Sequence, residues 1–434
     1  MAMKSDNRDQ WIRAADEELS NIEGHDVWDD QWEEPAAFLK TVWTFKTKPK
    51  TLSAAEKKKA RLCIQGFSQI PGLDYDNTFA PTGKYTSLLI VLMLAIDRKL
   101  PIQQFDVKSA FLFAPLKETL YIKTPEGCKR KAPYLKLKKS TLRTQTSTCQ
   151  LHSVIFFHVD DLVVVGKVDE FEKQFLIKFP NSAAHDPDTL LGMELLMDNN
   201  QIKLSQEKLI KKGLELAGIR ESPAVSILSS FNHAPGIQHW KQVLHCWKYL
   251  AGTINLHLTL RPNLMDNSQA LQHFTDATWA DDLETRLSRS GSICFWKACP
   301  IAWNSKKQRN ITMSSTKAEL NALSDGVQEN QWIKFLVEEL WNENLKPTQF
   351  HIDNQGLLKK LKNFGSNSKT KHIGIKMKKL RDMKKNEEIT VTLIPSDEMI
   401  ADALTKPSNF ESLCRLQEKC FLVQAHYSSS CGGC

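Results

Sequence analysis

The sequence lacks the long apolar segments of membrane and secreted proteins. Its longest apolar run, LLIVLMLAI at residues 88–96, is far shorter than the roughly 20 residues that span a bilayer. The N-terminal stretch MAMKSDNRDQWIRAADEEL is charged and then helical in pattern, without the apolar centre of a signal peptide. These absences predict an intracellular protein, cytoplasmic or nuclear, that is not secreted and has no membrane partner.

Paired cysteines are scarce as well. The ten cysteines are scattered singly, apart from the terminal CGGC, and none has the spacing of a structural zinc site. We therefore expect reduced thiols. The CGGC follows the polar stretch HYSSS, outside any predicted strand-helix unit, so a frayed tail is favoured over a redox pair or a metal site. The sequence also has no internal repeat and no low-complexity linker.

The composition is that of a globular protein of two or three domains. The chain has 434 residues, of which 41% are hydrophobic and 25% charged, enough to bury ordinary cores. The 58 Lys and Arg residues exceed the 50 Asp and Glu residues by eight, which favours a polyanionic partner such as nucleic acid. The polar stretch RPNLMDNSQ, residues 261–269, is the most favourable domain boundary.

Two adjacent carboxylates stand where a core is expected. The segment FFHVDDLVVVG sets Asp160 and Asp161 between apolar runs that predict a strand hairpin. Buried like charges repel and lose solvation, so a cation or hydrogen-bond donors must compensate them; the alternative is a tight turn that exposes both acids to water. Asp106, in QQFDVKSAFL, lies on a similar strand. Two strands that offer carboxylates to one point suit a two-metal phosphoryl-transfer site.

A second group of acids follows the predicted boundary. The chain alternates there in the order strand, hairpin, helix, strand, basic helix, strand, helix. Asp276, Glu319, Asp353 and Asp402 fall on four separate elements of this series. Each acid alone has an ordinary interpretation, because Glu319 could lie on a helix surface and Asp402 could be an acid in a first helical turn.

Five motifs, in this order, resemble the reverse transcriptase of copia-type retrotransposons: VWTFKTK, KKKARLCIQGFSQIPGLDYDNTFAPTGKYTSLLIVL, QQFDVKSAFL, LYIKTPEG and FFHVDDLVVVG. The resemblance implies an α+β or α/β fold class, with polymerase-like fingers and palm of the right-hand type followed by a ribonuclease H-like mixed-sheet domain. It also implies that Asp106, Asp160 and Asp161 hold metal ions in the palm.

The resemblance extends to substrate-binding residues. It implies that Lys59 or Arg61 of the fingers faces the triphosphate, and that Phe111 is a steric gate against a 2′ hydroxyl. For Arg61 the alternative is a solvated strand end. His372, in SKTKHIGIKMKKLRD, also fits a family motif; its basic, helical surroundings favour a phosphate-facing or structural role over catalysis.

The second group of acids matches the family residue for residue. The resemblance implies that Asp276, Glu319, Asp353 and Asp402 hold two Mg²⁺ or Mn²⁺ ions, one activating water and the other stabilising the leaving 3′ oxygen. Two ions are likewise implied for the palm site. The implied partners are an RNA/DNA hybrid, an RNA template with a DNA primer, and deoxynucleoside triphosphates.

Two segments are shorter than the family pattern. Residues 140–155 lack a Leu-Tyr-Gly-Leu-Lys-Gln motif and the long helix that backs the palm, and residues 221–238 replace a longer thumb and connection. His158 stands where the family usually has Tyr. We therefore expect an uncovered face on the palm sheet, an impaired polymerase and a retained ribonuclease H. The alternative is a catalytically dead remnant that binds nucleic acid. Decay and mis-splicing of the element would leave the same sequence.

The predicted domains are a shortened fingers and palm at 1–225, a residual thumb or connection helix with a linker at 226–267, a ribonuclease H-like domain at 268–412 and a tail at 413–434.

Overall fold

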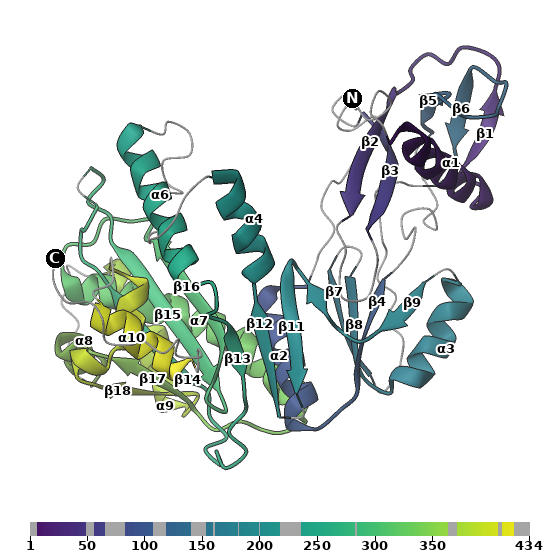
Figure 1. The fold of residues 1–434 in the computed structure, drawn as a ribbon. Coiled ribbons are helices and arrows are strands. Elements are labelled where there is room, and N and C mark those ends of the chain that lie inside the picture. Colours follow the sequence, from purple (N-terminus) through teal and green to yellow (C-terminus); the bar gives the residue numbers. More distant parts are fainter. Residues whose placement is uncertain are drawn as a thin grey trace.

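The computed structural model places two lobes at opposite ends of the molecule, with a buried helix, α2, between them (Figure 1). The residues that the structure describes are 7–48, 56–65, 83–106, 119–139, 153–158, 161–180, 182–198, 200–217, 236–282, 284–362, 371–406 and 410–420.

The N-terminal lobe is built on an amphipathic helix. Helix α1 buries Trp11, Ala14 and Ala15 against the hairpin of β2 and β3. A three-stranded sheet of order β1-β6-β5 packs beside it. The bounds are α1 Arg8–Gly24, β1 Trp28–Gln31, β2 Thr41–Lys48, β3 Lys57–Ile64, β5 Tyr121–Lys123 and β6 Tyr134–Leu137.

The palm sheet has four antiparallel strands in the order β7-β8-β4-β9. The predicted hairpin around the paired acids is confirmed, because β7 and β8 are antiparallel neighbours and His158 pairs with Asp161. Strand β4 lies next to β8 and carries Asp106 at its end. The bounds are β4 Ile102–Asp106, β7 Ser153–His158, β8 Asp161–Gly166, β9 Ala183–His185 and, for the helix that follows β8, α3 Val168–Lys178.

Helices cover both faces of the palm sheet, so the expectation of an uncovered face is wrong for the described strands. Phe105 and Val164 pack on α3 through Phe171. On the other face, Phe156 and Val163 belong to the core that contains α2 (Tyr85–Asp97). The expectation failed because it assigned the cover to the missing segment alone, whereas two other helices supply it.

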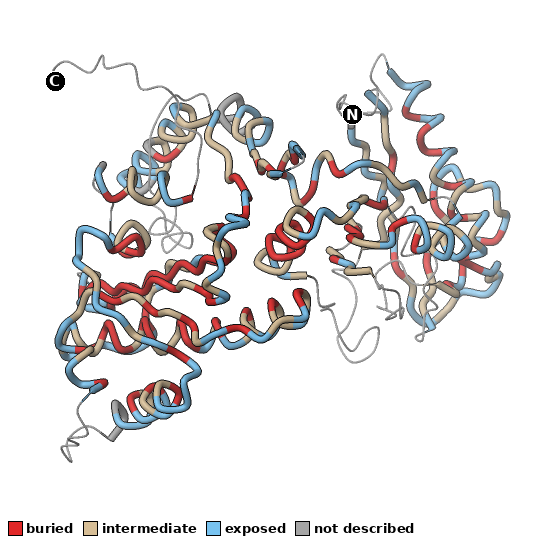
Figure 2. Tube along the Cα trace, turned by 90° about the horizontal axis from the view of Figure 1, so that it is seen from below, coloured by how far each residue is buried: buried red, intermediate tan, exposed pale blue. Residues whose placement is uncertain are grey.

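Helix α2 is buried on all sides. Its residues Leu88–Ala95 are all buried, because the helix contacts the palm strands, a second antiparallel sheet and the C-terminal lobe. Figure 2 shows buried residues concentrated along the strands of the C-terminal lobe and between the lobes. The second sheet and its helices are β10 Thr189–Leu190, β11 Met193–Asp198, β12 Gln201–Ser205, β13 Leu258–Leu260, α4 Glu207–Ala217 and α6 Ile237–Gly252. In the described part of the chain, no helix has the length and apolar character needed to cross a membrane.

The C-terminal lobe is a five-stranded mixed sheet in the order β16-β15-β14-β17-β18. Its first three strands are antiparallel, and β14, β17 and β18 run parallel. Helix α7 packs on β14 and β15, which completes the predicted ribonuclease H-like mixed-sheet architecture. The bounds are β14 Gln272–Ala277, β15 Arg289–Trp296, β16 Cys299–Lys307, α7 Ser315–Trp341, β17 Thr348–Ile352, α8 Gln355–Lys362, α9 Lys371–Lys385, β18 Ile389–Leu393, η6 Ser396–Glu398, η7 Ile400–Leu404 and α10 Phe410–Lys419.

Polar contacts fix the end of α2 to the C-terminal lobe. The carboxylate of Asp97, whose side chain is only 4% exposed, accepts hydrogen bonds at 2.6 Å from Lys297 Nζ and Trp341 Nε1. The neighbouring Arg98 donates to the Trp341 carbonyl at 3.1 Å and to Glu343 at 2.6 Å. The palm and the C-terminal lobe therefore share one apolar core and one buried ion pair.

Candidate active site

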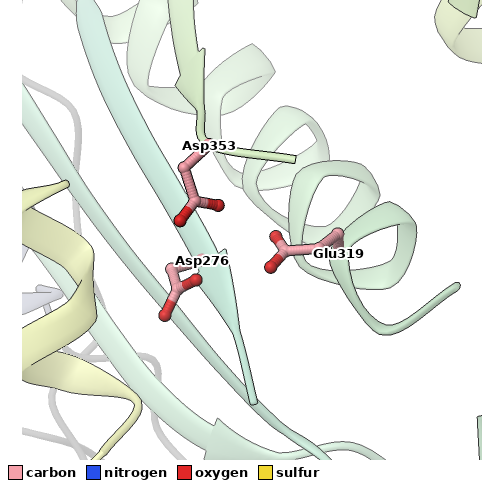
Figure 3. Close-up of side chains that lie close together, drawn as sticks. All are labelled: Asp276, Glu319 and Asp353. Carbon is pink, nitrogen blue, oxygen red and sulfur yellow. The ribbon is translucent and has the colours of Figure 1, made fainter. Parts of the chain in front are cut away.

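Three carboxylates converge at one edge of the C-terminal sheet. Asp276 lies near the end of β14, Asp353 directly follows β17, and Glu319 begins the second turn of α7. Because β14 and β17 are parallel neighbours, their carboxyl ends meet at the same sheet edge. One oxygen from each acid lies within 4.8 Å of the others, and Figure 3 shows the carboxylates pointing toward a common space.

The three acids differ in burial, and hydrogen-bond donors satisfy only part of their oxygens. Asp276 is 2% exposed and Glu319 4%, whereas Asp353 is half-buried. Thr405 Oγ1 donates to Asp276, and Ser396 Oγ donates to Asp353 Oδ2 at 2.9 Å. Glu319 Oε2 is buried without a hydrogen-bond partner. Such a group needs a proton or a cation, and oxygen donors of this kind suit Mg²⁺ or Mn²⁺.

The short helix η7 packs closely against this edge of the sheet. A β-carbon at Gly291 of β15 would stand 2.9 Å from the Ala401 carbonyl and 2.6 Å from Thr405 Cγ2. Glycine therefore lets η7 lie directly on β15, beside the strand that carries Asp276. This contact places Thr405 over Asp276.

Asp402, the fourth predicted acid, lies near the group but outside it. It sits on η7 and forms an ion pair with Lys406, with its side chain 22% exposed. Its charge still acts on Asp276, as does that of Lys406. The structure thus brings three of the four acids into contact distance and keeps the fourth as a charged neighbour.

Burial and mutual repulsion raise the proton affinity of the site. Burial, followed by the charges of Asp276 and Asp353, raises the pKa of Glu319 to about 9. Burial also raises the pKa of Asp276, against the opposing effects of the Thr405 hydrogen bond and the Lys406 charge. Without a bound cation, the group therefore holds a proton at neutral pH.

This proton affinity predicts a pH-dependent stability in EDTA. Glu319 has a pKa of about 9 in the folded chain, against the ordinary 4.5. The folded state thus binds the proton more tightly than the unfolded state. The stabilisation that this proton gives is complete below the unfolded-state pKa and is lost as pH rises through the folded-state pKa. The thermal unfolding midpoint should accordingly fall as pH rises between these two pKa values. Glu319→Gln should lack this part of the fall, because its amide does not titrate.

Adding Mn²⁺ should reverse the effect in the wild type, because the ion displaces the proton and binds only the folded site. Glu319→Gln should gain less from the metal. Identical pH profiles for the two proteins would contradict the assignment of the buried proton to Glu319.

Two of the palm acids lie on neighbouring strands. Asp106 ends β4 and Asp161 begins β8, and the two residues are directly opposite in the strand register. Gln104 Nε2 donates to Asp161 Oδ1 at 3.3 Å and to the Thr189 carbonyl at 3.1 Å. Asp160 lies outside the described residues. The strands therefore keep Asp106 beside the hairpin, and the metal role of these acids stays a prediction.

The predicted substrate-binding residues are only partly described. On β3, Lys59 and Arg61 flank Ala60, which packs on α1, so strand alternation directs them to the opposite face. Arg61 is exposed there. Phe111 lies outside the described residues, and for His372 the structure describes the backbone in α9 but not the side chain. Their roles stay predictions.

Sequence reasoning missed the hydrogen-bond donors of the site. Thr405 and Ser396 hold Asp276 and Asp353 by their hydroxyls, and Lys406 pairs with Asp402. Thr405 and Lys406 adjoin Asp402 in ADALTKP, which is the only sequence signal for them. The Thr405 contact with Asp276 becomes visible only when η7 packs on β15, whereas Lys406 pairs with Asp402 four residues earlier in the chain.

Comparisons with known proteins cover the whole chain. Residues 33–147 match the family described as reverse transcriptase (RNA-dependent DNA polymerase). The chain is 27% identical to the retrovirus-related Pol polyprotein from transposon RE2 of Arabidopsis thaliana, over 100% of this chain and 35% of that protein. It is 28% identical to the corresponding polyprotein from transposon TNT 1-94 of Nicotiana tabacum, over 87% of this chain and 35% of that protein. The chain thus spans about a third of the length of these relatives.

Among solved structures, the foamy viral protease-reverse transcriptase in complex with dsDNA is similar over 88% of this chain and 83% of that chain. The identity is 14% and the TM-score 0.44.

Proposed function

From the premise that the chain belongs to the copia-type retrotransposon Pol polyproteins, we propose that its C-terminal lobe cleaves the RNA strand of RNA/DNA hybrids with divalent metal ions. The observation that carries this proposal is the convergence of Asp276, Glu319 and Asp353 at one edge of a ribonuclease H-like sheet. The proposal assigns residues 268–412 to the nuclease.

The donor set fits two hard cations. Asp276, Glu319 and Asp353 would hold Mg²⁺ or Mn²⁺, with Asp402 as a further donor once it parts from Lys406. The unpartnered oxygen of Glu319 and its raised pKa both favour a cation in this space. Bound ions would supply an activated water and stabilise the leaving 3′ oxygen of the cut RNA strand.

Neighbouring side chains would orient the acids. Thr405 donates to one oxygen of Asp276 and Ser396 donates to one oxygen of Asp353, so each acid keeps a second oxygen that could bind a cation. Hydrogen-bond partners of this kind hold metal ligands in the productive geometry. Lys406 would neutralise part of the negative charge that otherwise repels the phosphate backbone.

The polymerase function is proposed to be impaired. Asp106 and Asp161 keep their adjacency, and both faces of the palm sheet are covered. The deficits lie instead in the two shortened segments, and the reverse transcriptase family match ends at residue 147, within the first of them. Since a misplacement of about 1 Å in a reacting group reduces a rate roughly 100-fold, a weakly held duplex should extend poorly.

A paired assay tests the proposal. One preparation of the full chain is given an RNA/DNA hybrid with labelled RNA and, separately, a DNA-primed RNA template with deoxynucleoside triphosphates. We expect cleavage that requires Mg²⁺ or Mn²⁺, and extension at least about 100-fold slower than cleavage. Binding should weaken as salt rises, because counterions are released from the hybrid.

The two alternative outcomes are distinct. Rapid primer extension would contradict the impaired polymerase. Hybrid binding without either activity would favour the second candidate, a catalytically dead remnant that binds nucleic acid, which the net charge of +8 also permits.

A further inference from the structure

An exposed tryptophan stands beside the carboxylate group without a role in the core. Trp279 is 54% exposed and follows the catalytic strand β14, three residues after Asp276. Its Nε1 donates to the Thr312 carbonyl at 2.9 Å, so the ring lies against the segment that precedes α7. That segment exposes two more apolar side chains, Ile311 at 59% and Met313 at 80%. We call Trp279, Ile311 and Met313 the ledge.

Buried hydrogen bonds hold the backbone of the ledge in place. Two hydrogen bonds join Thr278 to Arg289: Thr278 N donates to the Arg289 carbonyl at 3.0 Å, and Arg289 N donates to the Thr278 hydroxyl Oγ1 at 2.9 Å. Ser288 Oγ bonds Thr312 Oγ1 at 2.9 Å and accepts from Ala280 N at 3.1 Å. Hydrogen bonds therefore hold the ledge in a defined conformation.

Backbone strain beside the ring supports this view. Ala280 has a φ of 52°, in the left-handed region that a residue with a β-carbon rarely adopts. Such strain persists where surrounding contacts over-determine it, typically beside binding surfaces. The strained residue directly follows Trp279.

The ledge adjoins the reactive space. Three residues of extended chain span at most about 10 Å, which bounds the distance from Asp276 to Trp279 along the backbone. Glu319 accepts a hydrogen bond from the backbone of Ala277, two residues before Trp279. A duplex whose phosphate reached the carboxylates would thus lie over the ledge as well.

The charge around the ledge indicates the chemistry of its occupant. The exposed Arg309 lies two residues before Ile311, and the segment between Trp279 and β15 carries the exposed Arg286 together with the exposed acids Asp281 and Glu284. Apolar side chains beside arginines suit a nucleic acid, whose sugars and bases are apolar and whose phosphates are anionic.

We propose that the ledge binds the hybrid next to the scissile phosphate, with Trp279 against the sugar rings of the minor groove and Ile311 and Met313 extending that contact. This inference rests on the proposed function and assigns Trp279 as a positioning residue for the duplex. Aromatic contacts with nucleotides commonly contribute a factor of roughly 5 to 100 in affinity.

Binding in EDTA, where no cleavage occurs, tests the ledge independently of catalysis. Fluorescence anisotropy with a labelled RNA/DNA hybrid should show a Kd raised roughly 5- to 100-fold by Trp279→Ala and raised less by Trp279→Phe. Met313→Ser should weaken binding in the same direction. Trp32→Ala is the matched control, because Trp32 is 64% exposed in the N-terminal lobe, and it should bind like the wild type.

Three further measurements separate positioning from a structural role. Trp279→Ala should raise KM much more than it lowers kcat, should leave Mn²⁺ binding unchanged without nucleic acid, and should keep the wild-type thermal midpoint. If Trp279→Ala fails to fold, Trp279→Phe and Met313→Ser carry the test. A wild-type chain that binds with this dependence but does not cleave would refute the proposed function alone. Wild-type Kd and KM in all ledge variants, or no hybrid binding by the wild type, would overturn the ledge.

Discussion

Asp353→Asn should lower the rate of hybrid cleavage by more than about 100-fold. Loss of a residue that only hydrogen-bonds to a metal ligand already reduces activity roughly 10- to 100-fold, and Asp353 is itself a proposed ligand. The amide keeps the shape of the side chain and can still accept the Ser396 hydrogen bond, but it lacks the charge that holds a divalent cation. Single-turnover cleavage of a hybrid with labelled RNA measures the loss.

The same substitution at other acids calibrates this result. Asp382→Asn changes an exposed acid on α9 of the same lobe and should leave cleavage unchanged. Asp402→Asn should reduce cleavage less than Asp353→Asn, because Asp402 lies outside the close group and is already paired with Lys406. Cleavage by Asp353→Asn within about tenfold of the wild-type rate would refute the metal site, since ligand loss is expected to exceed that factor.

Asp97→Ala should destabilise the fold by roughly 3 to 5 kcal/mol, the usual consequence of removing one partner of a buried ion pair. The substitution leaves Lys297 Nζ and Trp341 Nε1 without their shared acceptor. Both groups lie where α2 meets the C-terminal lobe, so the loss should be felt in the palm and in that lobe together. Urea unfolding followed by fluorescence gives the free-energy change.

Hydrogen exchange shows where the stability is lost. In Asp97→Ala, the amides of β8 and those of β15 should both exchange faster, because the two strands share one core. Arg98→Ala removes a more exposed ion pair with Glu343 and should lower the unfolding free energy by about 1 kcal/mol or less. Faster exchange in one lobe alone would contradict the shared core.

Local patterns predicted the parts of the fold that local contacts determine. The apolar runs on both sides of the paired acids predict the hairpin, and the order of strands and helices after residue 269 predicts the mixed sheet. The convergence of Asp276 and Asp353 was implied by the family resemblance, and the structure explains it because β14 and β17 are parallel and end at the same sheet edge. The resemblance to the retrotransposon family supplied the remaining assignments.

Long-range packing was not visible in the sequence. The apolar run of α2 indicates a buried helix, but it does not reveal that palm strands and the C-terminal lobe cover different sides of it. The expected uncovered face of the palm sheet was wrong for this reason. Likewise, the Thr405 hydroxyl reaches Asp276 only because Gly291 admits η7 against β15.

Anomalous scattering from Mn²⁺ tests the metal centre most directly. A crystal of the chain grown with an RNA/DNA hybrid and soaked in MnCl₂ should show two peaks at the carboxylates of Asp276, Glu319 and Asp353, and the Asp353→Asn protein should lose at least one of them. Mn²⁺ bound elsewhere, with these three carboxylates contacting no ion in the wild-type complex, would contradict the proposed active site.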